Sequence, residues 1–274
     1  MELIVIPNID LKASRIGLGC ARLVGRSTAR ESRKLIEQAL ALGIRYFDVA
    51  PSYGMGTAEE LVGDVLGNSK DVIVATKVGP PRGTYSARAN AIRKYAKPAL
   101  DRFQSIKGLL RKGLAKSPSN QAPRPRYDFS RDRILRSIDE SCQLLRRDRI
   151  ETFLLHEPHL DDLTPTLSNT LTELAAAGRI GCWGVGIDAR SAQWKPFGQV
   201  WQSGWQTQTG ENVPDTQLIF HGVTRYAPRN AKGQPLEHPG ALLRRALAEA
   251  PSTIILVSAA NPARLRDLLT AYKG

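Results

Sequence analysis

Short, continuously apolar runs alternate along this chain with stretches whose apolar side chains recur at helical spacing. Residues 28–42 (TARESRKLIEQALAL) show that spacing, with Thr28 as the expected N-cap and Gly43 as the C-cap. The next run, IRYFDVA from Ile44, is rich in branched and aromatic residues, which is typical of a buried strand. Another long amphipathic helix is expected from Ser130.

The repetition of this strand–helix pattern predicts the fold class. Continuous apolar strands separated by amphipathic helices indicate a parallel sheet that is covered on its outer face. Eight strands are expected, beginning at Ile16, Arg45, Asp71, Glu151, Cys182, Trp205, Gln217 and Thr253. Eight such units in 274 residues predict an α/β fold of the (β/α)8 TIM-barrel type. A doubly wound sheet is the rival, but GLGCARLVG matches its GxGxxG fingerprint only in part.

Two further features complete the predicted organisation. The apolar opening from Leu3 to Ile9 is expected to form an N-terminal β-hairpin. Residues 80–126 interrupt the third strand–helix unit and are expected to form a basic insertion at the barrel mouth. The chain is therefore interpreted as one barrel domain over residues 1–274 that carries this insertion.

Composition places the chain among globular proteins. A hydrophobic content of 42% excludes a disordered or fibrous protein. No apolar run approaches the roughly 18 residues that a membrane span needs, and the opening MELIVIPNIDLK lacks the zones of a signal peptide. The three cysteines are far apart, so they provide neither a disulfide framework nor metal-ligand spacing. A cytoplasmic protein is expected.

A net charge of +13 suggests nucleic acid or an anionic membrane as a partner, but nearly all of this charge lies in one segment. Residues 82–126 contain twelve Lys and Arg against the single acid Asp101, so this segment carries +11 of the total. No nucleic-acid-reading motif accompanies it, and nucleic acid is not expected as a partner. A lid over the substrate pocket is the favoured interpretation. Peripheral contact with an anionic surface, and electrostatic steering of an acidic substrate or partner protein, are the alternatives.

Candidate chemistry lies where the expected strands end, because functional side chains of a barrel gather at the carboxyl ends of its strands. Asp48, Lys77 and His156 end three successive apolar runs, and Tyr53 follows Asp48 by five residues. Taken singly, a strand-end Asp or Lys is usually a structural ion pair, and a lone His is usually a core residue. Their joint occurrence favours an active site.

These residues carry a family resemblance. FDVAPSYGMGTAEELVGDVL resembles the signature of the aldo-keto reductase superfamily, and VATKVG resembles its lysine strand. YDFSRDRILRSIDESCQLLRRDRIETFLLHEP resembles its helix-plus-histidine-strand block. The resemblance covers most of residues 16–187 outside the insertion and returns near the C-terminus. It implies an NADP(H)-dependent oxidoreductase that transfers a hydride between nicotinamide and the carbonyl or alcohol of a small aldehyde, ketone or sugar.

The chemistry of the four residues fits that reaction. Reduction of a carbonyl needs a proton donor, here Tyr53. A neighbouring Lys77 ammonium is expected to lower the pKa of the phenol, and Asp48 to keep Lys77 charged in a dry site. A neutral His156 imidazole is expected to orient the carbonyl by a hydrogen bond.

The resemblance also implies a cofactor site on the later strands. Gln208 is expected to bind the nicotinamide carboxamide, Tyr226 to stack on the ring, and Arg264 to bind the adenosine 2′-phosphate. Ser258 and Asn261 are expected as phosphate neighbours at a helix N-terminus.

Three departures from the family pattern affect this side of the molecule. Gly186-Ile187 replaces the usual Ser-Asn, Val257-Ser258 replaces Pro-Gly or Pro-Lys, and Cys20 replaces a common Thr. They keep one alternative open, a cofactor-binding regulatory or redox-sensing barrel with weak activity. The basic residues 82–126 keep open another, an enzyme tethered to an anionic surface through this segment.

Overall fold

The computed structural model describes residues 1–6, 8–9, 11–24, 27–83, 125–188, 197–205, 217–225, 230 and 236–273. The chain divides into two compact units, one of Met1–Gly83 with Tyr127–Gly274 and the other of Thr84–Arg126. Of the second unit, only residues 125 and 126 are described. The lid or surface role of the basic segment therefore falls outside the described residues, and the single-domain interpretation stays a prediction.

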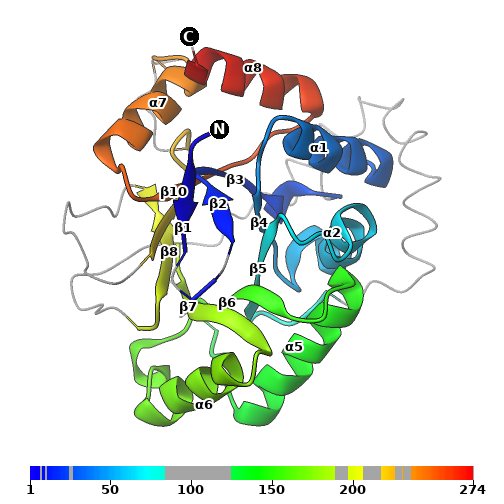
Figure 1. Cartoon of the computed structure of the whole chain (residues 1–274), viewed down its shortest axis with the longest axis vertical. Helices are drawn as coiled ribbons and strands as arrows, with labels where there is room; N and C mark the ends of the chain where they lie inside the picture. Colours follow the sequence, from blue (N-terminus) through cyan, green and yellow to red (C-terminus); the bar gives the residue numbers. More distant parts are fainter. Residues whose placement is uncertain are drawn as a thin grey trace, which may run out of the picture. The chain divides into compact units, whose positions relative to one another are not determined.

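The first unit is a closed barrel of eight parallel strands, as the apolar pattern predicts (Figure 1). The strands are β3 (Ile16–Gly19), β4 (Tyr46–Asp48), β5 (Ile73–Val78), β6 (Ile150–His156), β7 (Ile180–Gly186), β8 (Val200–Gly204), β9 (Gln217–His221) and β10 (Ile254–Val257). Strand β10 pairs with β3 and closes the barrel. The (β/α)8 prediction is confirmed.

The sixth barrel strand is the one that the pattern misplaces. It was expected to begin at Trp205, but β8 runs over Val200–Gly204 and ends before that residue. The sequence VWQSG contains Gln202 and Ser203, which are buried although polar. Because strands of this kind are usually recognised as continuous apolar runs, the polar residues conceal the true strand.

An antiparallel hairpin precedes the barrel, as expected, but it consists of β1 (Leu3–Val5) and β2 (Lys12–Ser14), so its second strand lies beyond the predicted bounds of Leu3 to Ile9. Buried side chains of the hairpin region, including Ile6, Ile9 and Ala13, share a core cluster with Tyr46 and Ile73 of the barrel strands. Tyr46 and Ile73 are the first residues of β4 and β5. The hairpin therefore closes the amino-terminal end of the barrel and leaves the carboxyl end for a site.

Helices cover the outside of the barrel: α1 (Ala29–Ala41), α2 (Ala58–Leu66), α5 (Arg131–Leu145), α6 (Pro165–Ala176), α7 (Pro239–Glu249) and α8 (Pro262–Lys273). Around the barrel, α7 contacts α8, α8 contacts α1, α1 contacts α2, and α2 contacts α5 (Figure 1). Thr28 caps α1 through a capping box with Glu31, and Ser130 caps α5. Among the described residues, no helix has the length and apolar character needed to cross a membrane.

Candidate active site

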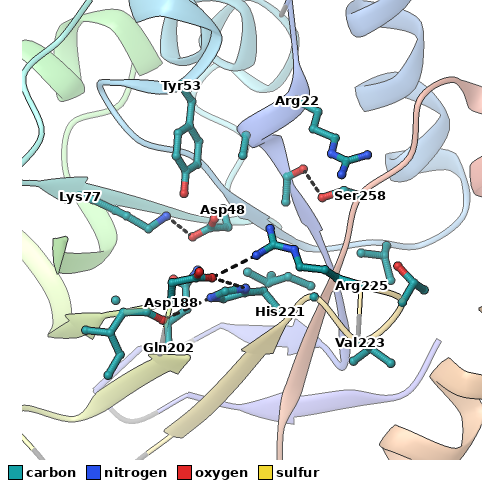
Figure 2. A pocket seen from close by; sticks show the side chains of 18 of the residues that line it. Arg22, Asp48, Tyr53, Lys77, Asp188, Gln202, His221, Val223, Arg225 and Ser258 are labelled. Atoms are coloured by element: carbon teal, nitrogen blue, oxygen red, sulfur yellow. Dashed lines mark hydrogen bonds and ion pairs between the residues drawn. The ribbon is translucent and has the colours of Figure 1, made fainter. Parts of the chain in front are cut away.

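A cavity of about 400 Å³ opens at the carboxyl end of the barrel, and all four predicted catalytic residues line it. Asp48 and His156 are the last residues of β4 and β6, and Lys77 lies one residue before the end of β5. Tyr53 follows β4 in the short 3₁₀ turn η2 (Tyr53–Gly56). Figure 2 shows the Tyr53 hydroxyl pointing toward the Lys77–Asp48 pair. The fold thus brings together residues that are distant in the sequence, of which Asp48 and His156 are 108 positions apart.

Lys77 and Asp48 form a buried ion pair at the base of the cavity. Their side chains are 1% and 4% exposed, and Lys77 Nζ donates to Asp48 Oδ1 at 2.5 Å and to the Val49 carbonyl at 3.1 Å. Burial alone lowers the pKa of Lys77, but Asp48 and Tyr53 together raise it above its usual value. The lysine is therefore held charged, as the sequence predicts for a carboxylate partner.

Tyr53 lies directly against this pair, with Lys77 Nζ 4.8 Å from the centre of its ring. Burial raises the pKa of Tyr53, Lys77 lowers it, and the net pKa is above the ordinary value. The expectation that Lys77 brings the phenol pKa below its usual value is therefore wrong for the net effect, although the lysine acts in the expected direction. Because desolvation dominates, the hydroxyl keeps its proton throughout the neutral pH range.

His156 completes the group by packing against Tyr53. The two rings meet edge to face, with centroids 5.9 Å apart and planes at 88°. Burial, then the charge of Lys77 and then His221, lower the pKa of His156 to about 3. The imidazole is accordingly neutral at physiological pH, as expected, and a neutral imidazole can donate one hydrogen bond to an oxygen in the cavity.

The predicted phosphate residues lie at and near the start of α8. Ser258 lines the cavity, and its Oγ donates to the Gly19 carbonyl at 3.2 Å. Asn261 Oδ1 accepts from the Arg264 backbone N–H at 2.9 Å, which places Arg264 in the first turn of the helix. The Arg264 side chain is exposed and makes no hydrogen bond or ion pair with any residue that the structure describes. Gln208 and Tyr226 lie outside the described residues.

Gln202 lines the cavity from β8 and was missed by the sequence analysis. The residue is only 4% exposed, and its buried Oε1 has no hydrogen-bond partner within the described part of the chain. A buried acceptor without a partner is costly, so it suits a ligand that brings a donor. The misplaced sixth strand concealed this residue.

His221 is a second missed residue, at the end of β9. Its Nε2 lies 3.3 Å from the Ile187 carbonyl, and its Nδ1 lies 4.0 Å from Asp188 Oδ1. Arg225 pairs with the same carboxylate at 3.3 Å (Figure 2). The sequence held a usable signal, because LIFH at the end of β9 repeats the pattern FLLH that ends at His156.

Comparisons with known proteins agree with this geometry. A family model described as the aldo/keto reductase family matches residues 15–202. The chain is 32% identical to a pyridoxal 4-dehydrogenase of Microbacterium luteolum over 194 residues, which cover 65% of this chain and 53% of that protein. It is 28% identical to a D-threo-aldose 1-dehydrogenase of a Pseudomonas species over 191 residues, which cover 67% and 50%. The chain thus spans about half the length of the curated relatives it matches.

Solved structures share the fold over nearly the whole chain. The holo form of the aldo-keto reductase AKR11C1 from Bacillus halodurans superposes with a TM-score of 0.66 at 19% identity, covering 100% of this chain and 91% of that one. The glycerol dehydrogenase AKR11B4 from Gluconobacter oxydans gives 0.65 at 18% identity, covering 99% and 89%. At this level of identity, the likeness concerns the fold alone.

Proposed function

The chain belongs to the aldo/keto reductase family, and on that premise we propose that it is an oxidoreductase that interconverts a carbonyl and an alcohol with a nicotinamide cofactor. The observation that carries the proposal is the buried Lys77–Asp48 pair against Tyr53, with a neutral His156 beside it. This arrangement combines a proton donor, a fixed positive charge and a neutral hydrogen-bond donor around one cavity.

In the proposed reaction, Tyr53 gives its proton to the oxygen of the substrate carbonyl. A reduced nicotinamide, when bound, supplies the hydride. Lys77 stabilises the phenolate that remains on Tyr53, since an ammonium in a dry site favours an adjacent anion. Asp48 keeps Lys77 charged, and His156 orients the carbonyl by donating a hydrogen bond to the same oxygen. The pKa of Tyr53 is raised by burial, so the phenol holds its proton at neutral pH, and the charge of Lys77, which lowers that pKa, favours release of the proton to the carbonyl.

The residues of the cavity fit a nicotinamide. We propose Gln202 as a ligand of the carboxamide, because the unpartnered Gln202 Oε1 is an acceptor that a carboxamide N–H satisfies. The proposals that Gln208 binds this group and that Tyr226 stacks on the ring remain predictions. The cavity volume falls within the usual range for small-molecule sites.

We propose NADP(H) as the cofactor, with Arg264 binding the 2′-phosphate and Ser258 and Asn261 as its neighbours. The support is the exposed Arg264 guanidinium in the first turn of α8, where the helix N-terminus also favours an anion. Two residues further on, Arg266 Nη1 donates to Gln38 Oε1 at 2.5 Å, so its guanidinium is engaged with α1.

The substrate is proposed to be a small aldehyde, ketone or sugar. Relatives named for pyridoxal, D-threo-aldose and L-galactose support this class. The polar cavity wall, with His156, Gln202 and His221, suits a ligand that carries several hydroxyl groups.

A regulatory or redox-sensing barrel is the second candidate, and the cysteines argue against its redox form. Burial raises the pKa of Cys142 to about 11 and of Cys182 to about 12, and it raises the pKa of Cys20 further. A thiol reacts as its thiolate, so these three groups are poor redox sensors. Their reduced state is consistent with a proposed cytoplasmic location. The lid and anionic-surface roles of residues 82–126 stay proposals.

The test is to mix the purified protein with NADPH or NADH and a panel of aldehydes, ketones and sugars, and to follow the loss of nicotinamide absorbance. Turnover with several carbonyls is expected, together with faster reaction from NADPH. If the protein binds the nucleotide tightly but no carbonyl compound causes the nucleotide to be oxidised, the result would instead support the regulatory barrel.

A further inference from the structure

Arg82 belongs by sequence to the basic segment, but its side chain does not behave as a solvated surface charge. The side chain is 23% exposed, and Nη2 lies 2.7 Å from Glu59 Oε2. The Glu59 side chain is 0% exposed, and a more distant carboxylate, on Glu140, lies 3.9 Å from Arg82 Nε. A fully buried carboxylate needs a compensating charge, and Arg82 provides it.

Glu59 also links the strand of Lys77 to the helix that follows the Tyr53 turn. It lies in the first turn of α2, the helix that follows the Tyr53 turn. Its second oxygen, Oε1, accepts a hydrogen bond from Thr76 Oγ1 at 2.6 Å. Thr76 directly precedes Lys77 on β5. One buried carboxylate therefore connects the strand of Lys77 to the helix that follows Tyr53.

Arg82 reaches the Tyr53 turn itself as well. Its Nη1 donates to the Gly56 carbonyl at 3.4 Å. Gly56 has a φ of 92°, and a Cβ at this position would lie 2.4 Å from the Gly83 carbonyl oxygen and 3.1 Å from Arg82 Cγ. The backbone at residues 82–83 thus packs directly on the turn, at a place where only glycine fits.

We propose that Arg82 and Glu59 are positioning residues that fix the hydroxyl of Tyr53 relative to Lys77; this inference rests on the proposed function. Within the described residues, neither side chain lines the cavity. They act through the backbone of η2, because a tyrosine has only two side-chain torsions and its hydroxyl follows the turn that carries it. A displacement of about 1 Å at a reacting group can cost on the order of 100-fold in rate.

The first experiment compares Arg82→Met and Arg82→Lys with Arg131→Met. Arg131 is a matched control, because it forms an ion pair of the same 2.7 Å length with Glu173, on the surface of the barrel. Arg82→Met is expected to lower kcat roughly 10- to 100-fold, with KM for the carbonyl and Kd for NADPH changed less than about threefold. Arg82→Lys is expected to recover part of kcat, and Arg131→Met to match the wild type.

A second set of variants separates positioning from folding. The double variant Glu59→Gln with Arg82→Met removes both charges of the ion pair, so that neither is left uncompensated. Thr76→Val breaks only the link to the strand of Lys77. We expect both proteins to keep cooperative thermal unfolding and wild-type affinity for NADPH while kcat falls about tenfold or more.

The outcomes are distinguishable. A folded double variant with wild-type kcat would overturn the positioning role, and so would an equal loss of kcat in Arg131→Met. If the wild type binds NADPH but reduces no carbonyl, the proposed function itself fails and the inference with it.

Discussion

The two sides of the barrel mouth differ in how completely their polar groups are partnered. On β4 to β6, the Lys77 ammonium is bound by Asp48 and Val49, and His156 packs against Tyr53. On β8 to β10, the buried Gln202 Oε1 has no partner among the described residues, and Arg264 extends from α8 without one. The first side is assembled before any ligand binds. On the second side His221 and Ser258 have partners. Gln202 and Arg264, in contrast, present groups that a ligand would satisfy.

The groups on the first side are the part of the proposed activity that the protein provides without a ligand. Catalytic side chains need fixed relative positions, because the rate depends on their geometry at the reacting atoms. Side chains that bind a cofactor need hydrogen-bond donors and acceptors that the ligand can engage, so these atoms have no partner within the described part of the protein.

Tyr53→Phe changes the β4 to β6 side and should give the largest effect. The ring is kept and the hydroxyl is lost, so carbonyl reduction should fall on the order of 10²–10⁴-fold while NADPH binding is retained. Steady-state turnover and a fluorescence titration of NADPH measure the two quantities. Near-normal turnover would contradict the role of Tyr53 as the acid.

Lys77→Met should also reduce stability strongly, because it leaves Asp48 buried without its partner. The expected loss is about 3–5 kcal/mol in the free energy of unfolding, measured by chemical denaturation. Adding Asp48→Asn should restore much of that stability but none of the activity. A single variant as stable as the wild type would show that the pair is not held in a dry site.

The depressed pKa of His156 should make the protein less stable in acid. The unfolded imidazole binds a proton below pH 6.5, whereas the folded one resists protonation down to about 3, so stability falls as the pH drops through this interval. The contribution is about 1.4 kcal/mol per pH unit. Denaturation curves of His156→Gln between pH 4 and 7 should show a shallower dependence on pH. Equal slopes in the two proteins would mean that the imidazole titrates normally.

Arg264→Ala tests the β8 to β10 side. Losing a charged contact to the 2′-phosphate should weaken NADPH roughly 10- to 100-fold and leave NADH nearly unchanged. Arg266→Ala is the matched control, since Arg266 is held by Gln38. Equal losses for NADPH and NADH would refute the phosphate assignment.

Gln202→Leu should have the smallest effect. Removing one neutral hydrogen bond should weaken NADPH and NADH alike, by roughly three- to tenfold. The same titrations measure it. A loss confined to one nucleotide would place Gln202 away from the nicotinamide, which both cofactors share.

The contrast between the two sides also explains how far the sequence alone could be interpreted. Asp48, Lys77 and His156 each end an apolar run, and Tyr53 follows in the same motif, so local pattern was sufficient to predict that they meet. On the other side, β8 carries Gln202 and Ser203 within the strand, and this polar interruption led to a sixth strand that was placed too late. The polar strand therefore hid Gln202, while the assignment of the carboxamide to Gln208 lies outside the described residues and stays a prediction.

Local patterns in the chain were enough to predict the barrel, its hairpin and the four catalytic candidates, because hydrophobic periodicity and strand-end residues are local properties. The tertiary fold sets the direction of the net shift in the Tyr53 pKa, because burial outweighs the charge of Lys77 there. It alone also separated Arg82 from the eleven other cations of residues 82–126, by placing it against a buried Glu59. Desolvation and charge pairing depend on which groups the fold brings together, and no local pattern encodes that.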